Sequence, residues 1–190
     1  RTNAYVLQET ETLVWSRGFT GVQAVFLVQD PTDGGGIILG RTEERFPAAT
    51  YGFTQGGPFY RAQANATGVP LVNSAYSAKN VREGRFYMNG ETWSGMTRGC
   101  PGPGYVVVES HPTSGTVADA FGCGYTSGIK DGAGLNGGMR IAECIVYTNA
   151  LTYAERLKVA QYLSRKWRGC DIAYDEMPDG EPGLKTIVGE

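Results

Sequence analysis

The 190 residues suit one domain, and 28 glycines, 11 % aromatic and 19 % charged residues favour short strands joined by turns over a helical protein. The 17 basic and 19 acidic residues give a net charge of −2, which offers no electrostatic basis for binding nucleic acid or an anionic membrane. No apolar run approaches the roughly 20 residues of a membrane-spanning helix, so we expect no membrane insertion by this chain.

Nearly all the predicted elements are strands, because runs of β-branched and aromatic residues alternate with Gly, Pro, Asn and Asp turns. Asn89-Gly90 is the clearest hairpin signal, since both residues tolerate positive φ. We predict that residues 17–21 separate the first two strands, and that residues 122–138 form a long glycine-rich loop. The predicted strands cover residues 12–16, 22–29, 37–40, 59–64, 84–88, 91–93, 105–109 and 117–121.

The segment 137–167 predicts a strand followed by the one convincing helix, at about residues 152–167. Thr152 and Glu155 have the spacing of a capping box, in which each side chain bonds the other residue's backbone amide. An apolar stripe follows along one face of the helix, formed by Val159, Ala160, Leu163 and Trp167. Beyond it the sequence is acidic and contains prolines, so we predict a domain over 1–170 and a tail or linker over 171–190.

Motifs in this segment resemble a known family. The motif Gly-x-Arg-Ile-Ala-Glu-x-Ile-Val-Tyr begins at Gly138, Ala-Leu-Thr-x-x-Glu-Arg begins at Ala150, and Tyr-Leu-x-x-Lys-Trp begins at Tyr162. Together they resemble the end of laminin G-like jelly-roll domains, which belong to the concanavalin A-like lectin/glucanase superfamily and are common in secreted bacterial proteins. With weaker upstream matches the resemblance covers about residues 12–168. It implies an all-β, two-sheet antiparallel jelly-roll β-sandwich with one C-terminal helix, but it leaves function open.

Hydrolases of that superfamily are the main enzyme alternative, and the sequence departs from their motif. Enzymes resembling family-sixteen glycoside hydrolases carry alternating acids on one strand, which point both carboxylates into one cleft. No predicted strand has this pattern. The nearest match, Glu176-x-x-Asp179-x-Glu181, lies across Pro178 and Gly180 in the acidic tail.

Other catalytic or nucleotide-binding patterns are equally weak. Gly35-x-x-x-x-Gly40-Arg41 lacks the lysine and the following helix of a phosphate loop, so we interpret it as a turn and strand. His111, the one histidine, follows Ser110 at a strand end and is predicted to be a surface turn residue. Glu143 lies in an otherwise apolar strand, where we expect loop amides or an arginine such as Arg156 to satisfy it.

The remaining hypothesis is ligand binding, because related jelly rolls hold sugars on aromatic faces presented from loops. Core or turn packing is the alternative role for each candidate. The candidate ligand-binding residues lie near glycine-rich turns and are Tyr51, Tyr60, Trp93 and Tyr125. No cofactor is required, but Ca²⁺ is common in relatives, and Asp119 and Asp131 are candidate ligands for it.

The four cysteines, Cys100, Cys123, Cys144 and Cys170, have no Cys-x-x-Cys spacing, which argues against a zinc site. Cys100 and Cys123 lie in glycine-rich loops and are the favoured pair if a disulfide forms. For Cys144 we favour a buried thiol, with a Cys144–Cys170 bridge as the alternative.

Together these features predict a non-catalytic module of a larger secreted or cell-surface protein, located outside the cell. Arg1 stands where an initiator Met is expected, so we expect a processed or excised fragment. The expected ligand is a carbohydrate or glycoconjugate. The alternatives are a structural or adhesion module that binds protein and, more distantly, a polysaccharide hydrolase or lyase.

Overall fold

The computed structural model describes residues 5–7, 13–30, 36–37, 39–40, 61–62, 78–94, 104–121 and 139–172. Its helices are α2 (Lys79–Arg82) and α3 (Tyr153–Arg168). Its strands are β1 (Tyr5–Leu7), β2 (Leu13–Val22), β3 (Ala24–Asp30), β4 (Gly36–Ile37), β5 (Leu39–Gly40), β6 (Arg61–Ala62), β7 (Arg85–Met88), β8 (Glu91–Trp93), β9 (Val106–His111), β10 (Thr116–Phe121) and β11 (Met139–Tyr147).

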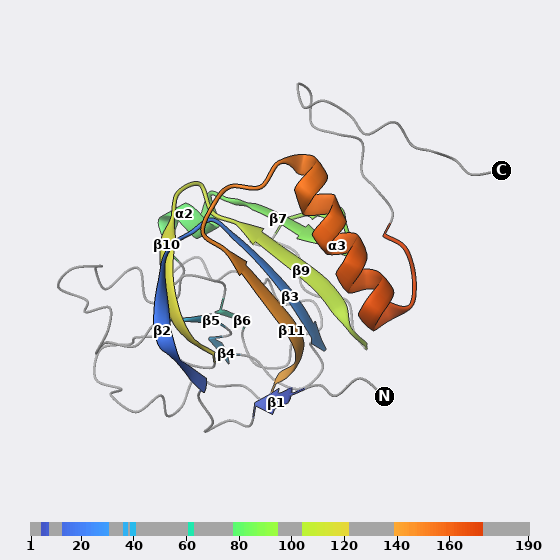
Figure 1. The fold of residues 1–190 in the computed structure, drawn as a ribbon, viewed down its shortest axis with the longest axis horizontal. Helices are drawn as coiled ribbons and strands as arrows, with labels where there is room; N and C mark the ends of the chain where they lie inside the picture. The colour runs from blue at the N-terminus through green and yellow to red at the C-terminus, as the bar shows by residue number, and fades with distance from the viewer. Residues whose placement is uncertain are drawn as a thin grey trace.

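The strands form two main antiparallel sheets, which confirms the expected β-rich fold. A six-stranded sheet has the order β1-β11-β3-β9-β7-β8, and a three-stranded sheet has the order β2-β10-β5. The pair β4-β6 is separate. Figure 1 shows α3 lying across one face of the larger sheet, where it packs on β9 and β3.

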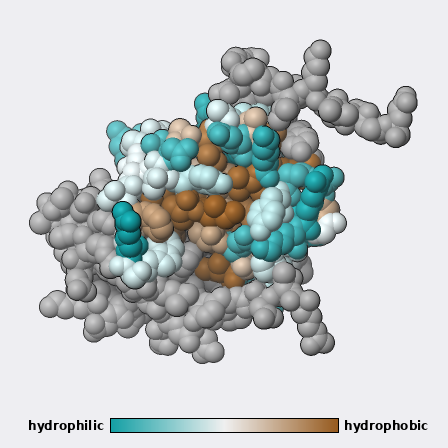
Figure 2. Space-filling view, viewed as in Figure 1, coloured by the Kyte–Doolittle hydropathy of each residue, from teal (hydrophilic) through white to brown (hydrophobic). Residues whose placement is uncertain are grey.

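Side-chain alternation along the central strands gives the larger sheet two buried faces. On β3, Val25 and Leu27 pack toward the smaller sheet, in what we call the inter-sheet core. Phe26 and Val28 pack toward α3, in what we call the helix-side core. In the space-filling view, hydrophobic residues among those described gather in the middle of the face turned toward the viewer, between more hydrophilic ones (Figure 2).

Helix α3 confirms the predicted helix and its capping box. Thr152 Oγ1 accepts a hydrogen bond from the Glu155 amide at 3.3 Å, and Glu155 Oε2 accepts one from the Thr152 amide at 2.9 Å. Gly169 ends the helix in the left-handed region at φ 68°, which glycine adopts without a Cβ penalty. Leu157, Ala160 and Leu163 are buried against the sheet, whereas Val159 and Trp167 of the predicted stripe are only partly buried.

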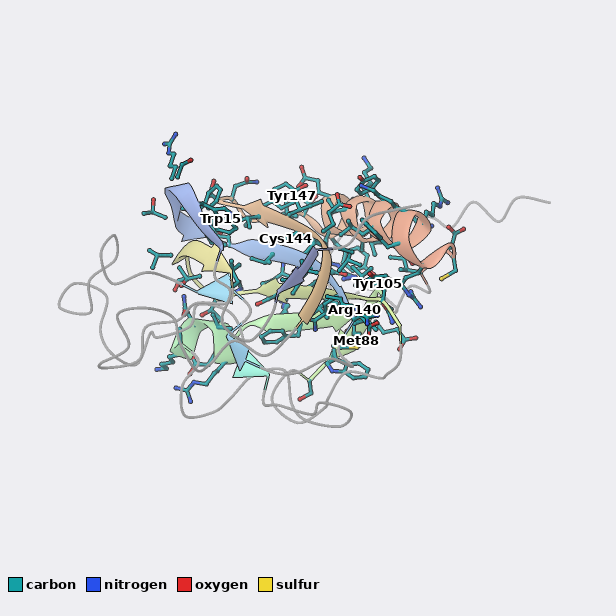
Figure 3. All side chains as sticks on the ribbon, turned by 90° about the horizontal axis from the view of Figure 1, so that it is seen from below. Trp15, Met88, Tyr105, Arg140, Cys144 and Tyr147 are labelled. Atoms are coloured by element: carbon teal, nitrogen blue, oxygen red, sulfur yellow. The ribbon has the colours of Figure 1, made fainter. Side chains whose placement is uncertain are left out.

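A register shift in β11 sets which side chains face the helix. The shift lies between Ile141 and Glu143 in the pairing with β3, and it allows Ala142 and Glu143 both to face α3. Alternation then resumes. Cys144 and Tyr147, both on β11 (Figure 3), pack on the inter-sheet and helix-side cores respectively.

The structure confirms one local prediction and corrects another. The Asn89-Gly90 hairpin turn is confirmed, with φ of 54° and 91° at the two residues. The predicted break between strands at 17–21 is wrong, because β2 continues through these residues to Val22. Register shifts in its pairing with β10 absorb the irregular sequence without ending the strand.

At the C-terminal end, packing continues past residue 170, where the predicted domain ends. Ile172 is buried in the helix-side core, and Asp171 pairs with Arg165 Nε at 2.6 Å. Within the described residues, neither helix has the length and apolar character to cross a membrane.

Candidate functional site

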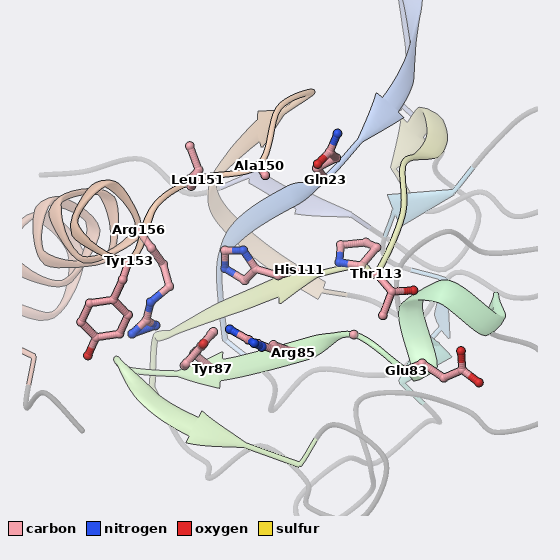
Figure 4. A pocket seen from close by; sticks show the side chains of 12 residues that line it. Gln23, Glu83, Arg85, Tyr87, His111, Thr113, Ala150, Leu151, Tyr153 and Arg156 are labelled. Carbon is pink, nitrogen blue, oxygen red and sulfur yellow. The ribbon is translucent and has the colours of Figure 1, made fainter. Parts of the chain in front are cut away.

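A pocket of about 510 Å³ opens on the helix-covered side of the larger sheet, beside the first turn of α3 (Figure 4). This volume lies in the range of small-molecule sites, roughly 300–1,000 Å³. Its walls come from β7, the end of β9, the residue before β3 and the segment 150–156. The larger polar and aromatic side chains in its lining include Gln23, Arg85, Tyr87, His111, Tyr153 and Arg156.

An ion pair from β9 to α3 lies beneath the pocket. Arg156 Nη1 is 3.2 Å from Glu109 Oε2 and 3.5 Å from Oε1, and Arg156 Nη2 donates to the Gly90 carbonyl at 3.2 Å. The Glu109 and Arg156 side chains are only 0 % and 4 % exposed. Such a buried pair needs additional hydrogen bonds to offset desolvation, and the Gly90 carbonyl supplies one.

His111 connects the ion pair to the pocket. Its Nε2 is 3.4 Å from Glu109 Oε2, and its side chain is 17 % exposed. The ring makes edge-to-face contacts with Phe26 and Tyr87, with centroids 5.7 Å and 5.6 Å away. The prediction of a surface turn histidine is therefore wrong. Glu109 and His111 are two residues apart on one strand, so both face α3.

Aromatic rings hold the arginine in place. The Arg156 guanidinium carbon lies 3.5 Å from the centroid of the Tyr87 ring and 5.0 Å from that of Tyr153. This is cation–π geometry. Arg156 Nε is buried and has no hydrogen-bond acceptor among the described residues. The rings and the ion pair fix the guanidinium as a rigid part of the pocket wall.

The backbone around the pocket is tightly packed. Arg85 pairs in register with His111, and Tyr87 with Glu109, so that side chains from β7 and β9 lie next to each other on one face. A Cβ on Gly84 would lie 2.5 Å from the His111 carbonyl oxygen, so only glycine allows this close approach of the two strands.

A second polar cluster lies away from the pocket and fastens the other end of α3. Glu143 accepts hydrogen bonds from Trp167 Nε1 at 2.7 Å, Lys166 Nζ at 2.8 Å and the Tyr162 hydroxyl at 3.2 Å. Burial alone would raise the pKa of Glu143, but these bonds together lower it. The expectation that Arg156 or loop amides satisfy Glu143 is wrong. Arg156 is engaged by Glu109, and Glu143 lies on the same side of β11 as Ile145 and Tyr147, beneath the end of α3.

Of the predicted sugar-binding residues, the structure describes only Trp93. Trp93 is half-buried on β8, packs against the inter-sheet core and does not line the pocket. The other three, Tyr51, Tyr60 and Tyr125, lie outside the described residues. Sequence reasoning missed Arg85, Tyr87 and Tyr153. The available signal was the spacing Glu109-x-His111 at the end of a predicted strand, which places both side chains on one face if the strand continues.

The side chains of both predicted calcium ligands lie outside the description. Asp119 lies on β10 with its side chain outside the description, and Asp131 lies outside the described residues altogether. In the part of the chain that is described, no three His, Cys, Asp or Glu side chains gather as metal ligands.

Cys144 and Cys170 are both free thiols, so the alternative Cys144–Cys170 bridge is not formed. Cys144 is partly buried and packs against the inter-sheet core. Burial, with a smaller contribution from the Glu143 charge, raises the pKa of its thiol to about 12. Cys100 and Cys123 lie outside the described residues.

Comparisons of the chain with family models, with curated proteins and with solved structures found no significant match.

Proposed function

We propose that this chain is a laminin G-like jelly-roll module of a larger secreted or cell-surface protein, and that its pocket binds a carbohydrate without catalysis. The observation that carries the proposal is the composition of the pocket. Sugars present both apolar CH faces and hydroxyl groups, and this pocket offers the Tyr153 ring beside the polar side chains of Gln23, Arg85 and His111. Pockets with a few fixed polar groups among aromatic side chains are typical ligand sites.

The rigid walls of the pocket support ligand binding. Tyr87 and His111 lie on paired strands, and Arg156 is held by Glu109 and two rings. A ligand that meets preorganised side chains loses less of its binding free energy to ordering the protein.

The carboxylates near the pocket argue for binding rather than hydrolysis. Glycosidases need two carboxyl groups about 5–10 Å apart across the scissile bond, one of them free to act as an acid. Glu109 is buried and engaged by Arg156 and His111. Glu83, the one acid among the described lining residues, lies beside Lys79 at the surface.

A glycan array with two matched variants tests the proposal. Tyr153→Ala removes an aromatic ring from the pocket, whereas Tyr162→Ala removes one from the same helix without touching the pocket lining. We expect wild type and Tyr162→Ala to bind the same glycans and Tyr153→Ala to lose about fivefold or more in affinity, since an aromatic face stacked on a ligand ring contributes roughly 1–3 kcal/mol. Binding to protein partners with no glycan binding would instead favour the adhesion alternative.

A further inference from the structure

The pocket contains one cationic side chain that the acids around it leave unneutralised. Glu109 is engaged by Arg156 at 3.2 Å and by His111 at 3.4 Å. Glu83 lies 3.8 Å from Lys79. Arg85 forms no ion pair with any acid in the described part of the chain.

Arg85 is also well placed to meet a ligand. It lies directly across from His111 in the β7–β9 pairing, and its side chain is exposed on the pocket side. Figure 4 shows its side chain extending along β7 toward Tyr87, below His111 in that view. The close contact between Gly84 and the His111 carbonyl sets the backbone from which Arg85 projects.

We propose, on the basis of the proposed function, that the pocket binds an acidic sugar whose carboxylate pairs with Arg85. The planar guanidinium presents two parallel N–H donors that match the two oxygens of a carboxylate. Tyr153 then faces the sugar ring, and Gln23 offers an amide to its hydroxyls. Arg156 does not compete for the carboxylate, because Glu109 already neutralises it.

The test compares ligands that differ only at C6. Methyl uronides of the gluco, galacto and manno configurations are titrated into the 190-residue chain, each beside its neutral methyl hexoside and the matching 6-sulfate, and amide shifts are followed by NMR. We expect at least one uronide to bind about tenfold or more tightly than its neutral parent, as a charge-assisted contact with Arg85 requires.

Variants test whether Arg85 causes the preference for uronides over neutral hexosides. Arg85→Gln should abolish it, and Arg85→Lys should restore it only in part, because a lysine keeps the charge but lacks the fork. Arg17→Gln is the matched control. It removes the same charge from an exposed position on β2, outside the pocket lining, and should change the preference by less than about twofold.

Four outcomes overturn the inference. Equal binding of uronides and neutral hexosides at the pocket refutes it but leaves carbohydrate binding intact. A preference for uronides that survives Arg85→Gln refutes the role of this residue, and stronger binding of the 6-sulfates refutes the assignment to carboxylate. If no sugar of any kind shifts the pocket amides, the proposed function fails as well.

Discussion

The buried ion pair beneath the pocket should stabilise the fold in a strongly non-additive way. Removing one partner leaves the other charge without its counter-ion, at side-chain exposures of only 0 % for Glu109 and 4 % for Arg156. Breaking such a pair from one side costs about 3–5 kcal/mol. In Glu109→Leu, the Arg156 cation would retain only the Gly90 carbonyl and the tyrosine ring faces.

Replacing both charges should be far less costly. The double variant Glu109→Leu/Arg156→Met leaves no buried charge, and such replacements are often neutral or stabilising. We therefore expect each single variant to lose about 3–5 kcal/mol of unfolding free energy and the double variant to lose less than either.

Urea unfolding followed by tryptophan fluorescence measures these differences, with Lys79→Met as the control. The Lys79–Glu83 pair is 3.8 Å apart and its side chains are 77 % and 57 % exposed, so its loss should cost less than about 1 kcal/mol. If the single variants cost no more than this control, or if their effects simply add in the double variant, the described role of the ion pair is refuted.

Three further predictions concern single residues. Glu143→Gln should destabilise the fold above the ordinary carboxyl pKa of 4.5, and the deficit should shrink as the pH falls below it, because the folded-state pKa is lowered; thermal unfolding from pH 3 to 7 checks this, and a deficit independent of pH contradicts it. Gly84→Ala should destabilise by about 1–3 kcal/mol and move the His111 NMR signals, because its Cβ would meet the His111 carbonyl oxygen at 2.5 Å; unchanged stability and spectra would refute the close contact. In the native state a thiol reagent should modify exposed Cys170 well before Cys144, whose raised pKa and burial keep it protonated and covered; equal rates by mass spectrometry would contradict this.

Features fixed by neighbouring residues could be predicted from the sequence. The capping box at Thr152 and Glu155 and the Asn89-Gly90 turn depend on spacings of one to three residues, and both are found as predicted. The apolar stripe of α3 likewise needs only helical periodicity.

The pocket could not be predicted in the same way, because its residues are brought together by strand order. Glu109 and Arg156 are 47 positions apart, and their contact depends on α3 lying over β9. The partners of Glu143 likewise depend on where the end of α3 lies over β11, because Lys166 and Trp167 are 23 and 24 positions away in the chain.

Carbohydrate binding at this pocket is tested most directly by an NMR titration of the 190-residue chain with a glycan identified on the array. We expect the largest shifts on the backbone amides of Arg85, His111 and Tyr153, which surround the pocket. Saturable shifts confined to β8 around Trp93, or no shifts with any glycan, would contradict it.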